Sequence, residues 1–219
     1  HYTDLGISPD RIHVIVNADS PESPRLRQAL QTLASFGAKP AEVWIGDYTS
    51  DGMWEKRREV QRRLATPEEW AISADVDEFH EYPDSLYAII DYCEQRNFNC
   101  VQGVFIDRLA PQGRLVEADP NSSLKERFPV RADVICSIGP EGQRHDRYGT
   151  VKLMLHKAEL FPSRGGHSPI GGGPEIRFLF GRPLAKSPAC AEAGFRFAFP
   201  FQVHHFKWRS SMVDSLRKR

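Results

Sequence analysis

The segment Trp70–Pro83 reads WAISADVDEFHEYP and joins an apolar run to a cluster of acids. The largely apolar residues 70–74 stop at Asp75, Asp77 and Glu78, which is the pattern of a buried strand that ends at a solvent-exposed, functional edge. In an extended chain the carboxylates of Asp75 and Asp77 lean to the same side and repel each other unless a hard cation lies between them or one stays protonated. The apolar lead-in and the aromatic residues that follow favour a metal site over the alternative, a surface turn rich in acids.

Composition indicates a globular chain of one domain. Of its 219 residues 40% are apolar and 26% are charged, which is enough apolar sequence for a sizeable core. Lys plus Arg and Asp plus Glu both total 29, so no overall field attracts nucleic acid. Residues 207–219 are locally basic, and we expect at most a peripheral membrane contact through this tail.

The cysteines and the hydropathy bear on the compartment. Cys93, Cys100, Cys136 and Cys190 form no CxxC pair and no zinc spacing, which fits a reducing compartment better than a disulfide scaffold. No apolar run approaches the ~20 residues of a membrane helix, and no signal peptide is visible. We therefore expect a cytoplasmic protein, either free or at the inner membrane surface.

Strand and helix patterns alternate through the first hundred residues. β-Branched runs predict short buried strands, and apolar residues spaced three and four apart predict helices between them. Ser23 followed by Pro24 is typical of a helix start, and Gly37 of a helix end. The predicted elements of this half are strands over residues 12–16, 43–45 and 70–74 and helices over residues 24–37, 53–64 and 84–97.

Loops are expected to make up more of the second half. Residues 113–149 show poor periodicity and predict loops and short strands, while the glycine-rich residues 161–174 favour either a lid over a ligand or an ordinary loop. Phe195–Val203 alternates phenylalanines with smaller or polar residues, which predicts a half-buried strand. The remaining predictions are strands over residues 100–106 and 151–155 and a basic amphipathic helix from Ser210.

Three landmarks follow one another along the chain: His1–Ile7 (HYTDLGI), the Asp-x-Asp-Glu-Phe segment of residues 75–79, and Val203–Trp208 (VHHFKW). Together they resemble the family 2-like glycosyltransferases with the A-type nucleotide-sugar-binding fold, in the branch with Asp-x-Asp-Glu-Phe. The resemblance spans most of the chain. It implies transfer of a sugar from a nucleotide-sugar donor to a glycan, lipid-linked or protein-linked acceptor, with Mn or Mg held against the diphosphate.

The fold class expected from the resemblance and the alternating pattern is α/β: a single Rossmann-like domain with a mostly parallel central sheet flanked by helices. Residues 1–110 would form the nucleotide-sugar-binding half, residues 111–206 the acceptor half and residues 207–219 a basic C-terminal helix. Related domains carry another strand and a polar loop before the His-Tyr helix. The first strand of the sheet could therefore be absent from this chain, which would leave the base pocket incomplete.

The resemblance also assigns metal ligands. It implies that Asp77 binds the metal directly and that Asp75 holds the donor ribose or a metal-bound water. His205 is the candidate third ligand, because it precedes the aromatic residue of the His-Phe-Lys pattern. Simple packing is the alternative for His205, and His167, which follows two glycines, competes for the same role. We expect Glu78 to brace the acidic loop.

Asp107 is the candidate base for the attacking hydroxyl. In a parallel sheet its carboxylate would emerge one strand beyond the metal motif and at the same edge. An ion pair with Arg108, or a capping role, is the alternative. If Asp107 is not the base, the candidates are Glu117, Asp133, Asp146 and Glu175, or the mechanism is a retaining one that needs no such residue.

Donor contacts are expected from polar residues around this edge. Residues at the first strand end would recognise the nucleoside, and the cationic helix over residues 53–64 passes the nucleotide. Lys152 points opposite to its apolar neighbours in its strand and joins this set. The predicted donor-binding residues are Asn17, Asp19, Arg57, Gln61, Asp75 and Lys152, with Arg58 as an alternative on the same helix.

Three functions follow in order of preference. The first is a metal-dependent glycosyltransferase of the hexosyltransferase type that builds a cell-surface polysaccharide or glycoconjugate. The second is a non-catalytic nucleotide- or sugar-binding domain of the same fold. The third is a phosphatase of the haloacid dehalogenase type, which uses the first Asp of an Asp-x-Asp motif as nucleophile but requires Thr or Val where this chain has Phe79.

Overall fold

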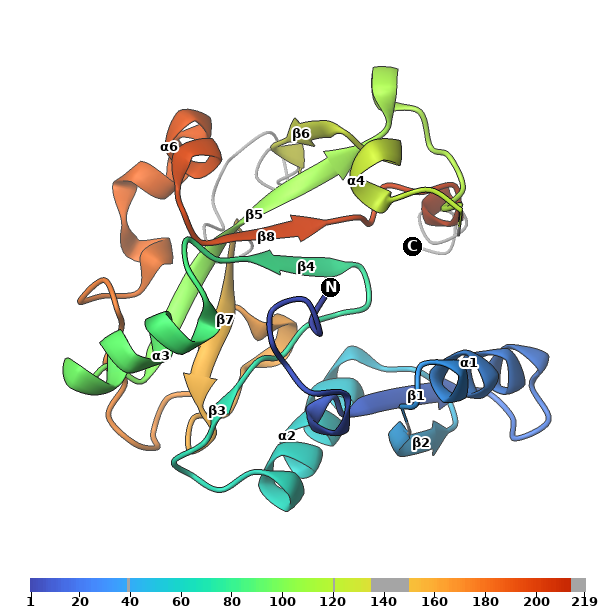
Figure 1. The fold of residues 1–219 in the computed structure, drawn as a ribbon, viewed down its shortest axis with the longest axis horizontal. Coiled ribbons are helices and arrows are strands. Elements are labelled where there is room, and N and C mark those ends of the chain that lie inside the picture. Colours follow the sequence, from blue (N-terminus) through green and yellow to red (C-terminus); the bar gives the residue numbers. More distant parts are fainter. Residues whose placement is uncertain (39, 120, 135–149, 214–219) are drawn as a thin grey trace.

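Within the described residues, the strands form two sheets (Figure 1). The structure, a computed structural model, describes residues 1–38, 40–119, 121–134 and 150–213. β1 (Val14–Ala18) and β2 (Pro40–Ile45) form a parallel pair. The larger sheet has the strand order β3-β7-β5-β8-β4, and β6 pairs with β5. Its strands are β3 (Trp70–Ala71), β4 (Glu78–Glu81), β5 (Cys100–Leu109), β6 (Val130–Ala132), β7 (Val151–Lys157) and β8 (Gln202–His205).

The expectation of a mostly parallel, Rossmann-like sheet is wrong. In the larger sheet β5 and β8 run parallel, whereas the pairs β3–β7, β7–β5, β5–β6 and β8–β4 are antiparallel. The result is a curled mixed sheet beside a small parallel pair. Alternating strand and helix patterns predict the elements, but the direction in which a strand joins the sheet depends on pairing between distant segments. Residues 72–77, for example, join β3 to β4, which lie at opposite ends of the strand order.

Helix boundaries follow local capping signals. α1 has Pro24 in its first turn, and Gly37 follows the helix at a φ of +70°. The side chains of Thr49 and Ser85 each accept a hydrogen bond from a backbone N–H in the first turn of the next helix. The helices are α1 (Pro24–Ser35), α2 (Ser50–Leu64), α3 (Leu86–Gln95), α4 (Leu124–Arg127) and α6 (Ala193–Ala198), with short 3₁₀ turns η1 (Pro9–Arg11), η2 (Pro111–Gly113), η5 (Arg164–Gly166), η6 (Leu184–Lys186) and η7 (Pro188–Ala191).

The positions of most predicted elements are confirmed, with ends shifted by a few residues. The strand expected over residues 70–74 is reduced to Trp70–Ala71. Residues 211–213 are helical, and the rest of the predicted C-terminal helix, residues 214–219, lies outside the described residues. Cys93, Cys100 and Cys190 are buried, and Cys136 is also outside the described residues.

The strand predicted over Phe195–Val203 is wrong. Its first part is helix α6, and β8 begins only at Gln202. In the helix Phe195 packs on Phe199, with their ring centroids 5.1 Å apart. Residues that alternate with a period of two also include pairs four apart, which share a helix face, so the sequence pattern fitted both structures.

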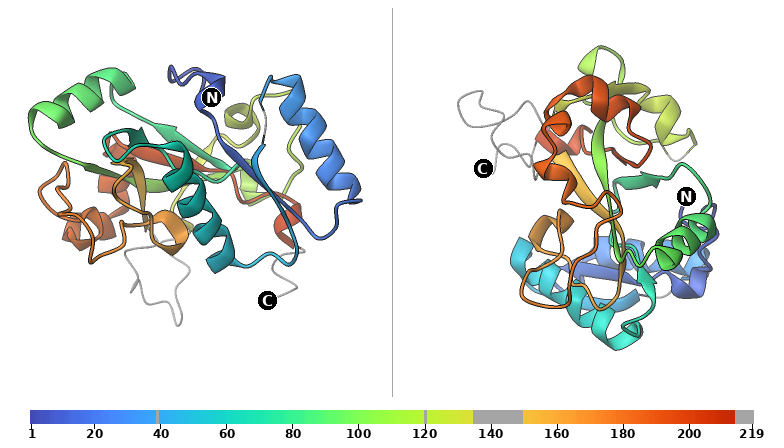
Figure 2. Two further views of the ribbon diagram at one scale, coloured as in Figure 1. Left: turned by 90° about the horizontal axis from the view of Figure 1, so that it is seen from below. Right: turned by 90° about the vertical axis from the view of Figure 1, so that its left-hand side faces the viewer.

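β5 lies at the centre of the core and is covered on both faces. On one face it packs with Ile89 and Cys93 of α3 and with Met154 of β7. On the other face it packs with Leu184 and Ala185 of η6. In Figure 2 the parallel pair with α1 and α2 lies at one end of the molecule and α6 at the opposite end. None of the helices in the described part of the chain combines the length and apolar character that crossing a membrane requires.

Candidate functional site

The acidic residues form a tight turn between β3 and β4. The backbone N–H of Glu78 donates to the carbonyl oxygen of Asp75 at 3.0 Å, and the N–H of Asp75 donates to the Glu78 carboxylate at 3.0 Å. Val76, at the apex, is 90% exposed. The turn therefore holds Asp75 and Asp77 on either side of an exposed apex, instead of in the extended chain that the sequence predicted.

Each aspartate of the turn faces a cation. Asp75 forms an ion pair with Arg57 of α2, whose guanidinium lies 4.4 Å from the ring centroid of Trp54. Burial alone would raise the pKa of Asp75, but the positive charges of Arg57 and Lys152 hold it below its usual value. Asp77 Oδ2 lies 3.5 Å from the guanidinium of Arg209. Each aspartate of the turn thus already has a cation beside it.

Glu78 points inward and pairs with Lys152. The Lys152 ammonium donates to Glu78 Oε1 at 2.7 Å, and the two side chains are 1% and 3% exposed. The expectation that Glu78 braces the acidic loop is confirmed, because its other carboxylate oxygen receives the Asp75 N–H. Lys152, predicted to contact the donor, instead binds a protein carboxylate beneath the turn.

Sheet register places two further candidates next to Glu78. His205 of β8 is paired with Glu78 of β4 on one side and with Asp107 of β5 on the other. His205 Nδ1 lies 3.4 Å from Asp107 Oδ1, which also accepts a hydrogen bond from Trp208 Nε1 at 2.7 Å. Asp107 is 2% exposed and His205 7%. The structure therefore brings Asp107 and His205 together on paired strands, with the indole N–H of Trp208 on Asp107, and not at an open strand end.

The alternative partner of Asp107 is also accounted for. Arg108 Nε donates to the carbonyl oxygen of Phe128 at 2.9 Å, and its guanidinium lies 5.9 Å from the ring centroid of Phe206. Because neighbouring strand residues point to opposite faces, the two side chains diverge. The Asp107–Arg108 ion pair weighed from the sequence is replaced by the contacts with Trp208 and His205.

Several predicted donor-binding residues have structural hydrogen bonds. Asn17 Nδ2 donates to the carbonyl oxygens of Trp44 and Gly46, each at 3.0 Å. Gln61 Nε2 donates to two carbonyl oxygens of the segment after β7, at 2.8 and 3.0 Å. Asp19 is exposed beyond the end of β1. Asn17 therefore ties β1 to the end of β2, Gln61 ties α2 to the segment after β7, and Asp19 is exposed to solvent.

The other candidate bases and ligands within the described residues, and His204 beside His205, have partners other than Asp75 and Asp77. His204 is paired with Glu81 at 2.5 Å, and His167 Nδ1 is 2.7 Å from the carbonyl oxygen of Val151. Asp133 pairs with the buried Arg196. Glu117 accepts from Ser210, Glu175 is exposed with Arg177 at 3.6 Å, and Asp146 lies outside the described residues.

The glycine-rich segment divides into two parts. Its first part, η5, packs on α2, and Arg58 donates to the carbonyl oxygen of Pro162 at 3.3 Å. In its second part, residues 171–173, a Cβ added at any glycine would meet no atom within 4 Å. The first part is therefore a packed wall beside the turn, and the second part is open.

The side chains around the turn have the chemistry to bind a divalent cation, but they are not arranged as a preassembled metal site. Asp75 and Asp77 supply carboxylate oxygens, and His205 Nδ1 is a buried ring nitrogen that makes no hydrogen bond in the described structure, with Asp107 Oδ1 3.4 Å away. In the described part of the chain, however, no three acidic, histidine or cysteine side chains lie close enough to form a metal group. A cation at this turn would have to compete with Arg57 and Arg209.

Sequence reasoning missed the residues that support the turn. The ring of Trp54 lies under the guanidinium of Arg57, and the hydroxyl of Tyr2 donates to the backbone carbonyl of Glu78 at 2.9 Å. Trp208 contacts Asp107, and Arg209 contacts Asp77. The His1–Ile7 and Val203–Trp208 motifs located two of these segments without indicating the contacts.

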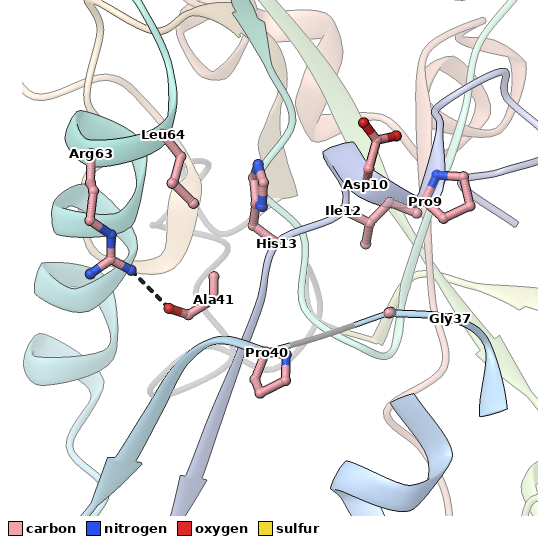
Figure 3. Close-up of a pocket in the computed structure, with 10 residues that line it drawn as sticks. Pro9, Asp10, Ile12, His13, Gly37, Pro40, Ala41, Arg63 and Leu64 are labelled. Carbon is pink, nitrogen blue, oxygen red and sulfur yellow. Dashed lines mark hydrogen bonds between the residues drawn. The ribbon is translucent and has the colours of Figure 1, made fainter. Parts of the chain in front are cut away.

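A pocket of about 520 Å³ lies away from the turn (Figure 3). It is lined by η1, the starts of β1 and β2, and the end of α2, where Arg63 donates to the carbonyl oxygen of Ala41 at 2.8 Å. None of its lining residues belongs to the charged set around Asp75, so we do not assign it to the candidate site.

Comparison with protein-family models, with curated proteins and with solved structures finds no match. The candidate site therefore rests on its own geometry and on the sequence motifs.

Proposed function

We propose that this chain is a metal-dependent glycosyltransferase that moves a sugar from a nucleotide-sugar donor to a glycan or glycoconjugate acceptor. The observation that supports it best is that the Asp75–Glu78 turn adjoins the strands of His205 and Asp107, because Glu78 pairs with His205 and His205 pairs with Asp107, which joins two of the three sequence landmarks. The backbone N–H of Phe206 donates to the carbonyl oxygen of Asp77 at 2.8 Å, so the Val203–Trp208 motif is bonded directly to the Asp-x-Asp turn.

In this proposal Asp75, Asp77 and His205 would hold Mn or Mg. When bound, such a cation supplies positive charge that stabilises a departing diphosphate. Arg57 is already beside Asp75 and one of its terminal nitrogens is buried without a partner, so it has a donor to offer a phosphate oxygen. Asp107 would accept the proton of the attacking hydroxyl, and the indole N–H of Trp208 orients this carboxylate.

The first test is binding. We expect Mn²⁺ with a nucleoside diphosphate, drawn from a panel of UDP, GDP, ADP and CDP, to raise Tm by about 5–10 °C at roughly 100-fold excess over Kd. Asp77→Ala should abolish this shift and leave the Tm of the unliganded protein nearly unchanged, because an ion pair near the surface contributes little. Asp91→Ala, which removes an exposed carboxylate on α3, serves as the control and should keep the shift.

Two outcomes would contradict the proposal. If no member of the panel shifts Tm with Mn²⁺ or Mg²⁺, donor binding fails, and if sugar transfer proceeds fully in EDTA, the metal requirement fails.

A non-catalytic binding domain is the second candidate. The observation that favours it is the burial of Asp107, which is 2% exposed and hydrogen-bonded to the indole N–H of Trp208. Binding of metal and nucleotide with no consumption of any nucleotide-sugar donor, measured by chromatography of the released nucleotide, would select this alternative.

A further inference from the structure

The ion pair between Glu78 and Lys152 lies directly behind the acidic turn. Its two side chains are 3% and 1% exposed, so both charges have been removed from water. Burying a pair of charges is rarely favourable for stability alone, because the loss of hydration offsets the attraction between them. A buried pair at this position therefore suggests a role in placing groups around it.

Glu78 fixes the turn through three contacts. Its Oε2 accepts the N–H of Asp75, its own N–H donates to the carbonyl oxygen of Asp75, and its carbonyl oxygen accepts the hydroxyl of Tyr2. Because Oε1 is held by Lys152, the carboxylate cannot rotate without breaking a charged hydrogen bond. The position of Lys152 therefore determines where Glu78 holds Asp75.

Lys152 is in turn fixed by its surroundings. Its ammonium lies 5.4 Å from the ring centroid of Trp54 and 5.6 Å from that of Phe105. Gly166 closes the remaining side, since a Cβ added there would lie 2.5 Å from Trp54 Cη2 and 2.9 Å from Lys152 Cε. The backbone of η5 thus approaches Lys152 more closely than any other residue type would allow.

We propose that Lys152 and Glu78 are positioning residues: Gly166 and Trp54 fix Lys152, Lys152 fixes Glu78, and Glu78 fixes the turn that presents Asp75 and Asp77. The glycine-rich segment is thereby coupled to the acidic turn across the sheet. The consequence for metal and nucleotide binding rests on the proposed function, whereas the consequence for the turn itself does not.

The first experiment compares two glycines of the same segment. Gly166 and Gly172 both have positive φ, +66° and +86°, so alanine at either strains the backbone, but at Gly172 the added Cβ meets nothing within 4 Å. We expect Gly166→Ala to speed amide hydrogen exchange of residues 75–78 on the order of tenfold relative to α3, a local opening. Gly172→Ala should leave the exchange rates of residues 75–78 and of α3 unchanged.

The second experiment separates positioning from stability. Lys152→Met and Glu78→Gln each leave a buried group without its partner and should lower Tm. The double variant Glu78→Leu/Lys152→Met removes both charges, so its Tm should recover above that of both single variants. Exchange of the turn amides should stay fast in the double variant, because the Asp75 N–H no longer has the Glu78 carboxylate as acceptor.

The proposal is overturned if turn exchange recovers together with Tm in the double variant, or if Gly166→Ala and Gly172→Ala behave alike. Both measurements, amide exchange of the turn and Tm, use unliganded protein and do not depend on the proposed function. If wild type binds Mn²⁺ and UDP, Gly166→Ala should also raise the Kd on the order of tenfold at unchanged Tm relative to Gly172→Ala. Absence of binding to wild type would instead refute the proposed function and leave the exchange result valid.

Discussion

Asp107 and Trp208 are the residues on which the chemical proposal can be tested most directly. Asp107→Asn keeps an oxygen that accepts from Trp208 Nε1, so we expect the Tm and the donor affinity to change little. As loss of a general base, the substitution should lower kcat by about 10²–10⁴-fold. The measurement is steady-state transfer from the donor that the binding panel identifies.

Trp208→Phe is the matched control, because it removes the N–H that donates to Asp107 and keeps an aromatic side chain at this position. We expect it to lower kcat by less than about tenfold. Normal turnover by Asp107→Asn would remove Asp107 as the base, and a parallel fall in Tm and kcat in both variants would indicate a purely structural role.

At the residue level, the sequence predicted the identity of the charged groups better than their partners. Asp75 and Asp77 were recognised from the apolar run before them, and Glu78 was expected to brace the loop. Lys152 could not be paired with Glu78 in advance, because the two are 74 residues apart and meet only through the folding of the sheet. Alternation within one strand gives the side of a residue but not its partner on another.

Among the elements, α2 carries the support for the turn. It holds Trp54 and Arg57, and its first turn is capped by Thr49, which accepts the N–H of Gly52 at 3.1 Å. We expect Thr49→Ala to lower the free energy of unfolding by about 1 kcal/mol, the usual value of such a cap. It should also weaken Mn²⁺ and nucleotide binding, because Arg57 depends on this helix. Chemical denaturation and the thermal shift measure the two effects.

Ser85→Ala is the corresponding change at α3, where Ser85 accepts the N–H of Ala88 at 3.2 Å. It should reduce stability by a similar amount and leave binding unchanged, since α3 contacts the core and not the turn. Equal loss of binding in both variants would show that α2 has no specific role at the site.

Element types were more predictable than element pairing. Local signals such as Ser23-Pro24 and Gly37 marked helix α1. The short strand Glu78–Glu81 was not expected, although Glu78 and His80 are buried and alternate with Phe79 and Glu81. Its pairing with β8 depends on a segment more than 120 residues away, which no window of local sequence contains.

Across the whole molecule, buried histidines with a lowered pKa, among them His80 and His156, make the free energy of unfolding depend on pH. Burial lowers the pKa of His80 to about 3, with the charge of Lys152 adding to the effect, and burial lowers the pKa of His156 to about 4. In the unfolded chain a histidine titrates near its ordinary value of 6.5. Below that pH the unfolded state binds protons that the folded state does not.

We therefore expect full stability above pH 6.5 and a progressive loss as the pH falls toward 4. The slope is up to about 1.4 kcal/mol per pH unit for each buried histidine. Urea unfolding at pH 7.5, 6.0 and 5.0 measures it in a window above the ordinary carboxyl range, where Asp75, whose pKa is lowered from 3.8, stays ionised. His156→Leu should reduce the slope by the contribution of one histidine, whereas His13→Leu, at an exposed site, should leave it unchanged. If the free energy of unfolding of His156→Leu depends on pH as steeply as that of wild type, His156 takes up its proton inside the folded protein. The buried, neutral state described for His156 would then be wrong.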